Sequence, residues 1–491
     1  MSSEARKIGF DSLALLGAKI FSLIVALVRL KFIAVFLGVD QFGVYIFATY
    51  FVTMFSVLFD LGLPQILTRD VSANPSRASS YLLNSSLIKV VLLLGSGAVV
   101  ALVTFISEFD PLTNWTLFFS FLILGTNSFS ALFAAAFQAY RKMTSVSLLT
   151  VFSETFSSLA AVIILGLGGT LFEFLLGTLI VNLLYLAVVA RAARRALGLS
   201  RSTIDTRLWT RLAREGVPVA LSSAGIVMYM YLTLTLLKYL KGDELVAYYG
   251  AAFKFITILT LIPSSLVQVM FPFFAQLFSA KAEKLPSVLE GSVRYILIVA
   301  IPLSLGTILI AEKLIFLLFT PAFMPAVTAL QILMVANLLS YANWILYSFL
   351  LAVGQQRFTM MVTLATGLVV VALNVLLIPQ YGIIIPSLSL VLVEFTLFVS
   401  AFLRLNVFGY RLNLGRLFAK PLIAALGMGI IVYVLDPLPV GLQILVGVVA
   451  YGAMFTSIKG VLPEDRDVIE RILPPPIGEW ILSRIPAAKI R

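Results

Sequence analysis

The sequence predicts an all-α polytopic membrane protein of about 14 transmembrane helices, and two observations carry this prediction. Of the 491 residues, 60% are hydrophobic and only 12% are charged, which is too few charges for a water-exposed surface. The apolar residues fall in runs of roughly 18–28 positions, the length that a helix needs to cross a hydrocarbon core of about 30 Å. Because lipid offers no hydrogen bonds, the backbone of these runs must satisfy itself as helices.

The apolar runs are separated by short segments, and none of the predicted external loops is long enough to hold a folded domain. The predicted helices span residues 9–38, 42–67, 81–106, 114–138, 145–166, 172–190, 213–238, 246–277, 291–311, 326–351, 359–378, 382–403, 419–435 and 441–458. The first run is too long for the apolar core of a cleavable signal peptide, so we expect it to remain as the first membrane helix.

Lysine and arginine are distributed unevenly among the loops, which predicts the orientation of the helices. With a cytoplasmic N-terminus, 27 of the 35 basic residues fall in inside segments and three in outside segments. A missed helix would exchange the two sides of every later loop, so this asymmetry supports the helix assignment. The net charge of +12 therefore indicates orientation rather than nucleic-acid binding. We expect a multi-pass protein of the plasma membrane with both termini cytoplasmic.

A short internal repeat divides the chain into halves. The segment Phe36-Leu-Gly-Val-Asp-Gln-Phe-Gly-Val-Tyr45 recurs as Tyr239-Leu-Lys-Gly-Asp-Glu-Leu-Val-Ala-Tyr248, each at the turn between the first two helices of a half. The copies lie an even number of helices apart, so both halves have the same orientation, and transporters often place their site at such a repeat interface. The predicted domains are an N-lobe over 1–200, a C-lobe over 201–410, extra helices over 411–460 and a cytoplasmic tail over 461–491.

Further motifs follow the first repeat copy in order, across roughly residues 5–410. They are Asp60-Leu-Gly-Leu63, Gln138-Ala-Tyr-Arg-Lys142, Gly354-Gln-Gln-Arg-Phe358, and Asn374 to Pro379 followed by Tyr381-Gly382. In this order and spacing the chain resembles the polysaccharide-biosynthesis, O-antigen-type flippases of the multidrug/oligosaccharidyl-lipid/polysaccharide exporter superfamily. The resemblance implies two six-helix lobes in parallel repeat around a central cleft, two extra C-terminal helices, and export of lipid-linked sugars by alternating access.

Polar side chains lie on single faces of four predicted helices, two from each half. The candidate substrate-binding residues on these faces are Lys19, Ser22, Arg29, Thr53, Asp60, Tyr229, Lys254, Thr257 and Gln268. In the family that the chain resembles, these helices meet at the cleft. The alternative is that stripes of hydroxyl residues and glycine only mark helix packing.

Charged residues within the predicted helices divide into two groups. Arg29 and Lys254 lie at similar depth, roughly 13 Å from the outer ends of their helices. We expect no acidic side chain at that level, so both are candidates to hold the phosphate or pyrophosphate headgroup of a lipid-linked glycan. Snorkelling to the outer headgroups is the alternative for Arg29. Asp60, Lys89 and Glu154 lie nearer the cytoplasmic side, where a structural ion-pair cluster is the simpler interpretation.

Three functions remain open from these residues. The favoured one is flipping of a lipid-linked oligosaccharide or polysaccharide precursor to the outer leaflet, with membrane lipids and glycan-assembly enzymes as partners. A drug/cation antiporter of the same superfamily is the alternative, although the four polar faces offer Asp60 as their only acid. A membrane glycosyltransferase or polymerase is less favoured, because the acidic Glu108-Phe-Asp110 lies in a short loop with no catalytic domain. With no cysteine and no histidine, we expect no enzymatic activity, metal or cofactor.

Overall fold

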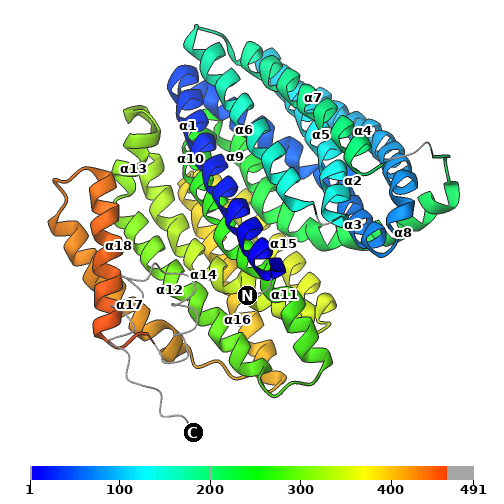
Figure 1. Ribbon diagram of the computed structural model, residues 1–491. Coiled ribbons are helices and arrows are strands. Elements are labelled where there is room, and N and C mark those ends of the chain that lie inside the picture. The colour runs from blue at the N-terminus through cyan, green and yellow to red at the C-terminus, as the bar shows by residue number, and fades with distance from the viewer. Residues whose placement is uncertain (1–2, 141, 199–201, 462–491) are drawn as a thin grey trace. The chain divides into compact units, whose positions relative to one another are not determined.

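The computed structural model describes residues 3–140, 142–198 and 202–461 of the protein, so the predicted tail lies outside these residues apart from residue 461. Every regular element in the described residues is a helix (Figure 1). In order they are α1 (Ser3–Met54), α2 (Ser56–Asp60), α3 (Leu63–Ala73), η1 (Pro75–Arg77), α4 (Ala78–Ser107), α5 (Pro111–Ala139), α6 (Met143–Gly166), α7 (Leu171–Ala196), α8 (Thr206–Val227), η2 (Met228–Leu232), α9 (Thr233–Lys241), α10 (Asp243–Leu259), α11 (Leu261–Ser279), α12 (Leu285–Leu309), α13 (Ala311–Leu318), η3 (Pro321–Phe323), α14 (Ala326–Ala352), α15 (Gln356–Tyr381), α16 (Ile384–Val407), α17 (Leu414–Val434) and α18 (Val440–Ser457).

The predicted all-α polytopic membrane fold is confirmed, whereas the count of 14 spans stays a prediction. In the described residues, 11 helices are long and apolar enough to cross a membrane, or 12 if one pair bent by 40° is counted as a single span. That bent pair consists of Ile24–Met54, the later part of α1, and Ser56–Ala73, which comprises α2 and α3. Element α1 therefore contains the predicted helix over 9–38 and the first part of the one over 42–67. The predicted helix over 213–238 is divided among α8, η2 and α9, and is not among the 11.

The break between α2 and α3 has a local cause in the sequence. Leu61 and Gly62 both adopt left-handed backbone conformations, with φ of 40° and 63°. Glycine takes this conformation without the strain that a Cβ atom brings, and Pro64 then begins α3 in the first turn, where its missing N–H is not needed. The break leaves backbone groups without their helical partners, which is tolerated at membrane depth only where protein or water covers them.

A second irregularity interrupts the helix that follows the Arg-rich segment. Residues Met228–Leu232 form a π-helical turn, η2, between α8 and α9. A π-helical turn inserts one extra residue into the helical repeat and so rotates the side chains that follow it. Such turns occur frequently at functional sites.

The chain forms two compact units. The first comprises Met1–Ala251, Leu318–Pro325 and Thr363–Pro386, and the second comprises Ala252–Leu317, Ala326–Val362 and Ser387–Arg491. The predicted division into lobes over 1–200 and 201–410 stays a prediction.

In the first unit the two copies of the repeat lie directly against each other. A Cβ atom on Gly43 would approach the backbone oxygen of Asp243 to 2.2 Å, so only glycine fits this contact. The ring of Phe42 packs edge-on against Phe323 at 5.3 Å and against Phe319 at 5.9 Å. We call these five residues the outer seal, because both repeat turns are predicted to lie outside the membrane.

In the second unit α17 and α18 pack against each other, and α17 packs along α12 (Figure 1). Lys313 of α13 anchors the turn between α17 and α18, pairing with Asp436 at 2.9 Å and donating to Oε1 of Gln443 at 3.1 Å. The hydrogen bond from Lys313 lowers the pKa of Asp436 below its ordinary value. Tyr451 donates to the carbonyl of Ile298 at 2.8 Å, so the extra helices are held by polar as well as apolar contacts.

Candidate functional site

A cavity of about 340 Å³ lies beside the break between α2 and α3 in the first unit. Its volume falls in the range of small-ligand pockets, roughly 300–1,000 Å³. The residues that line it are Thr53, Ser56, Val57, Asp60, Leu61, Gly62, Pro64 and Gln65 from α1–α3, and Ala220, Val227 and Tyr231 from α8 and η2. The two irregular helices therefore form the walls of one polar pocket.

The pocket side chains combine hydroxyl, amide and carboxylate groups on an otherwise apolar wall. Thr53 and Asp60 come from the polar face that the sequence predicts, and Ser56 lies between them on the same face. The hydroxyl of Thr53 donates to the carbonyl of Thr49 at 2.6 Å, which leaves its oxygen as an acceptor. Gln65, one turn after the break, adds an exposed amide group.

Asp60 is tied to a buried lysine behind the pocket wall. The side chain of Lys89 is 0% exposed, and its Nζ donates to Oδ1 of Asp60 at 2.6 Å and to the carbonyl of Ser128 at 2.8 Å. The hydroxyl of Ser128 donates to the same Oδ1 atom of Asp60. The Asp60 side chain is 40% exposed, so it presents its carboxylate to the pocket while Lys89 balances its charge.

The prediction that Arg29 lacks an acidic partner is wrong. A guanidinium nitrogen of Arg29 lies 3.5 Å from Oε2 of Glu154, because α6 packs along α1 and brings these distant residues together. Lys254 is not without a partner either. Glu154 thus pairs with Arg29 and is not a member of the Asp60–Lys89 cluster. The Arg29–Glu154 pair is loose, since no hydrogen bond to Oε2 forms among the described residues.

The other predicted site residues are spread more widely. The side chains of Lys19 and Ser22 lie outside the described part of the chain. Lys254, Thr257 and Gln268 belong to the second unit, on α10 and α11, where the last two are exposed. Of these residues, the described Lys254, Thr257 and Gln268 are not among those that line the pocket.

Tyr229 is buried, and Tyr231 lines the pocket in its place. The predicted stripe contains Tyr229, whereas the pocket is lined by Ala220, Val227 and Tyr231, which lie seven and four residues apart on another face of the same helical segment. The ring of Tyr231 stacks on Tyr50 with centroids 5.6 Å apart, which fixes its position. Sequence reasoning missed Tyr231 because it followed the face that carries Tyr229, and it also missed Gln65, although Gln65 closely follows the Asp60-Leu-Gly-Leu63 motif.

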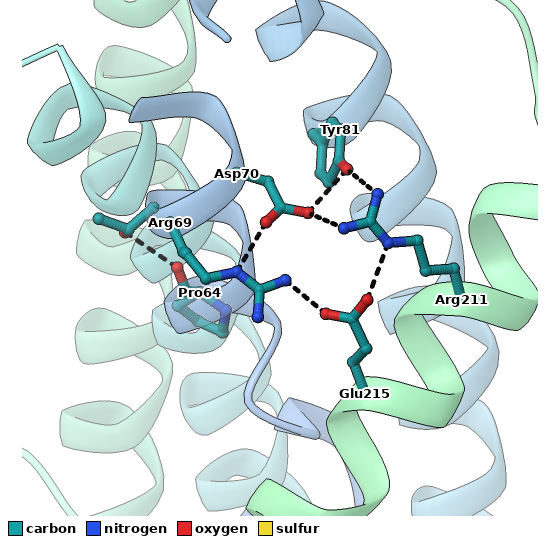
Figure 2. Close-up of polar contacts among 7 residues, drawn as sticks. Pro64, Arg69, Asp70, Tyr81, Arg211 and Glu215 are labelled. Carbon is teal, nitrogen blue, oxygen red and sulfur yellow. Dashed lines mark hydrogen bonds and ion pairs between the residues drawn. The ribbon is translucent and has the colours of Figure 1, made fainter. Parts of the chain in front are cut away.

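A ring of charged side chains lies next to the pocket (Figure 2). Arg69 and Asp70 of α3 face Arg211 and Glu215 of α8, and we call these four residues the ionic ring. Arg69 donates to Asp70 at 2.7 Å and also to Glu215, while Arg211 donates to Glu215 at 2.8 Å and to Asp70 at 3.0 Å. Tyr81 of α4 donates to Asp70 at 2.8 Å and accepts from Arg211 at 3.2 Å. The ring therefore joins α3 to α8, and Tyr81 connects it to α4.

Comparison with known proteins gives concordant matches. A family model described as "Polysaccharide biosynthesis protein" matches residues 9–278. An uncharacterized membrane protein of Methanocaldococcus jannaschii is 25% identical over 314 residues, which span 61% of this chain and 61% of that protein. The structure of the lipid II flippase MurJ, in an inward closed conformation, aligns with a TM-score of 0.68 at 14% identity, covering 94% of this chain and 99% of that one. An inward-facing multidrug resistance MATE family transporter of the MOP superfamily aligns with a TM-score of 0.65 at 12% identity, covering 81% and 98%.

Proposed function

The chain belongs to the polysaccharide biosynthesis protein family, and on that premise we propose that it flips a lipid-linked oligosaccharide or polysaccharide precursor across the plasma membrane. The glycan moves from the cytoplasmic to the outer leaflet by alternating access, and the protein acts as a transporter rather than an enzyme. Glycan-assembly enzymes on the cytoplasmic side supply the substrate. The observation that carries the proposal is a polar pocket formed by two interrupted helices within a membrane protein.

The chemistry of the pocket suits sugars better than a lipid tail or a bare ion. Hydroxyl groups of a sugar need donors and acceptors together, and Thr53, Ser56, Gln65 and Tyr231 offer both at one site. Helix breaks place such groups at membrane depth in many transporters. Because Asp60 is balanced by Lys89, the pocket accepts hydroxyl groups without a large net charge.

We propose that Arg29 in the first unit and, separately, Lys254 in the second unit supply positive charge for headgroup phosphates. The Arg29 side chain is 26% exposed and its pair with Glu154 is loose, so a phosphate oxygen can replace the carboxylate. Arginine forms two parallel hydrogen bonds to phosphate, which outweigh one imperfect ion pair. Lys254 supplies a second point charge on α10.

A drug/cation antiporter is the second candidate, and the likeness of the fold to MATE transporters supports it. A cationic drug requires a net negative site. The carboxylate of Asp60 faces the pocket but is neutralised by Lys89 at 2.6 Å, which favours the glycan substrate.

The test is flipping by the purified protein in vesicles that carry a fluorescent lipid-linked oligosaccharide. We expect fluorescent lipid that starts in the inner leaflet to become accessible to a membrane-impermeant quencher faster in vesicles with the wild-type protein than in protein-free vesicles. Ser56→Phe fills the pocket and should abolish this exchange, whereas Leu58→Phe, on the exposed side of the same helix, should not. Equal rates with Ser56→Phe and wild type would contradict the proposal. Efflux of a cationic dye against an ion gradient, without flipping, would favour the antiporter.

A further inference from the structure

We propose that the ionic ring of Arg69, Asp70, Arg211 and Glu215 is a latch that closes the pocket on its cytoplasmic side and opens to admit the substrate. The proposal deepens the proposed function and rests on it for the identity of the substrate. The closure itself rests on geometry within the first unit, and it can be tested without any glycan.

The position of the ring relative to the pocket is the first argument. On α3, Gln65 lines the pocket and Arg69 follows one turn later, while on α8, Ala220 lines the pocket and Glu215 precedes it by about one turn. Between pocket and ring, a Cβ atom on Gly216 would approach the carbonyl oxygen of Leu61 to 2.4 Å. The two helices therefore touch at this level, and the ring lies beyond the contact.

The side of the membrane follows from the distribution of charge. Arg69 and Arg211 both belong to segments that the excess of basic residues predicts to be cytoplasmic. A substrate made in the cytoplasm and entering between α3 and α8 has to pass the ring.

The ring is closed but accessible to water. Each carboxylate uses both oxygens, so that Asp70 and Glu215 each hold both arginines (Figure 2). The side chains of Arg69 and Arg211 are 59% and 47% exposed. Asp70 is only 11% exposed, whereas Glu215 is 31% exposed. Exposed ion pairs contribute little to stability and weaken with salt, so the pairs of both arginines with Glu215 are contacts that binding of a ligand can break.

The start of α8 has a different kind of anchor. Asn84 of α4 is fully buried, accepts from the backbone of Asp205 and from Nε1 of Trp209, both at 2.8 Å, and donates to the carbonyl of Thr203 at 3.2 Å. Leaving buried groups without these partners is costly. Asn84 is thus a fixed attachment about which α8 can turn when the ring opens.

The outer seal contrasts with the ring at the opposite end of these helices. It consists of aromatic packing and a glycine contact in which Gly43 meets the Asp243 backbone without room for a methyl group. Dry, close-packed contacts of this kind are not loosened by salt or by a charged ligand. The weak polar contact at the ring is therefore the one that opens first.

The experiment uses the absence of native cysteine. Ser56→Cys places a single thiol in the pocket, and a membrane-impermeant maleimide is added from the cytoplasmic face of inside-out vesicles. Adding Glu215→Gln, or Asp70→Asn, should accelerate labelling about five- to thirtyfold, the population shift that corresponds to roughly 1–2 kcal/mol. Arg214→Gln, an exposed neighbour outside the ring, is the matched control and should leave the rate unchanged.

Salt supplies an independent measurement on the intact ring. Raising ionic strength should accelerate labelling in the Ser56→Cys protein but not after Glu215→Gln and Asp70→Asn are combined with it. If a ring variant fails to accumulate, the salt response alone decides the matter. If neither salt nor the ring substitutions change the labelling rate, the latch proposal is wrong, whether or not the protein flips glycans. Accelerated labelling with no flipping of any lipid-linked glycan contradicts the proposed function and leaves the latch intact.

Discussion

At the scale of single residues, the charges inside the helices are managed by pairing. Lys89 has no exposure and is satisfied by Asp60 and Ser128, while Arg29 is partly exposed and held only loosely by Glu154. The tight pair is suited to holding helices together, and the loose pair to exchanging its partner. Each assignment predicts a different response to substitution.

Asp60→Asn should lower the abundance of the protein more than it lowers transport per molecule. The substitution leaves Lys89 buried without a counter-charge, which costs roughly 3–5 kcal/mol. Quantifying the protein in membranes and flipping per molecule separates the two effects. The double variant Asp60→Asn, Lys89→Met removes the stranded charge and should restore most of the abundance. Normal abundance together with lost flipping in Asp60→Asn would instead indicate direct contact of Asp60 with the substrate.

Arg29→Lys should retain part of the flipping activity, Arg29→Ala little and Arg29→Glu none, all at normal abundance. Lysine keeps the charge but loses the two-pronged hydrogen bonding to phosphate. Glu154→Gln is the control, because it removes the competing carboxylate and should preserve flipping. The same vesicle assay measures all four variants. If the double variant Arg29→Ala, Lys254→Ala flips normally, these cations do not bind the headgroup.

At the scale of elements, the pocket depends on two helices that are not continuous. The left-handed Leu61–Gly62 pair ends α2, and Tyr231, which lines the cavity, lies within the π-helical turn η2. The close approach of the repeat turns at the outer seal holds these helices in register. Because there is no room for a methyl group at Gly43, a substitution there can test whether the outer seal is tightly packed.

Gly43→Ala should destabilise the protein, by about 1–3 kcal/mol if the neighbouring backbone yields as in an overpacked core. The added methyl group would overlap the backbone oxygen of Asp243, which has no flexible side chain to move aside. Thermal unfolding of the purified protein in detergent measures the effect. Gly95→Ala is the matched control, since nothing lies within 4 Å of its Cβ position, and it should be neutral or mildly stabilising. Equal stability of both variants would show that the outer seal is not tightly packed.

At the scale of the whole molecule, orientation follows from the distribution of lysine and arginine, and reporter fusions can test it. Fusions at Arg77, Ser202, Lys284, Gln356 and Asn413 should report cytoplasmic positions, and those at Asp110, Gly242, Phe323 and Pro437 outside positions. The decisive pair is Ser202 and Gly242, which flank the helix broken by η2. Reporters on the same side at these two positions would mean that this helix does not cross the membrane, and the predicted count of 14 would be wrong.

The sequence by itself determined the fold class, the family and most helix positions. Long apolar runs and scarce charge specify membrane helices locally, because each run must satisfy its own backbone in lipid. Ordered motifs such as Phe36–Tyr45 identified the family that the match over residues 9–278 confirms. Thr53 and Asp60 were found for the same local reason, since they are seven residues apart and this α-helical spacing places them on one face.

Only the tertiary structure decided which distant residues meet. Glu154 reaches Arg29 because α6 packs along α1, and no periodicity within either helix encodes that contact. Tyr231 lines the pocket instead of Tyr229 because the face of Ala220, Val227 and Tyr231 meets the α1–α3 wall, and which face of a helix meets a neighbour depends on packing. The ionic ring likewise joins Asp70 and Glu215, which are far apart in the chain. Helix formation depends on near neighbours, whereas charge pairing depends on how the helices pack, and that is a property of the folded chain as a whole.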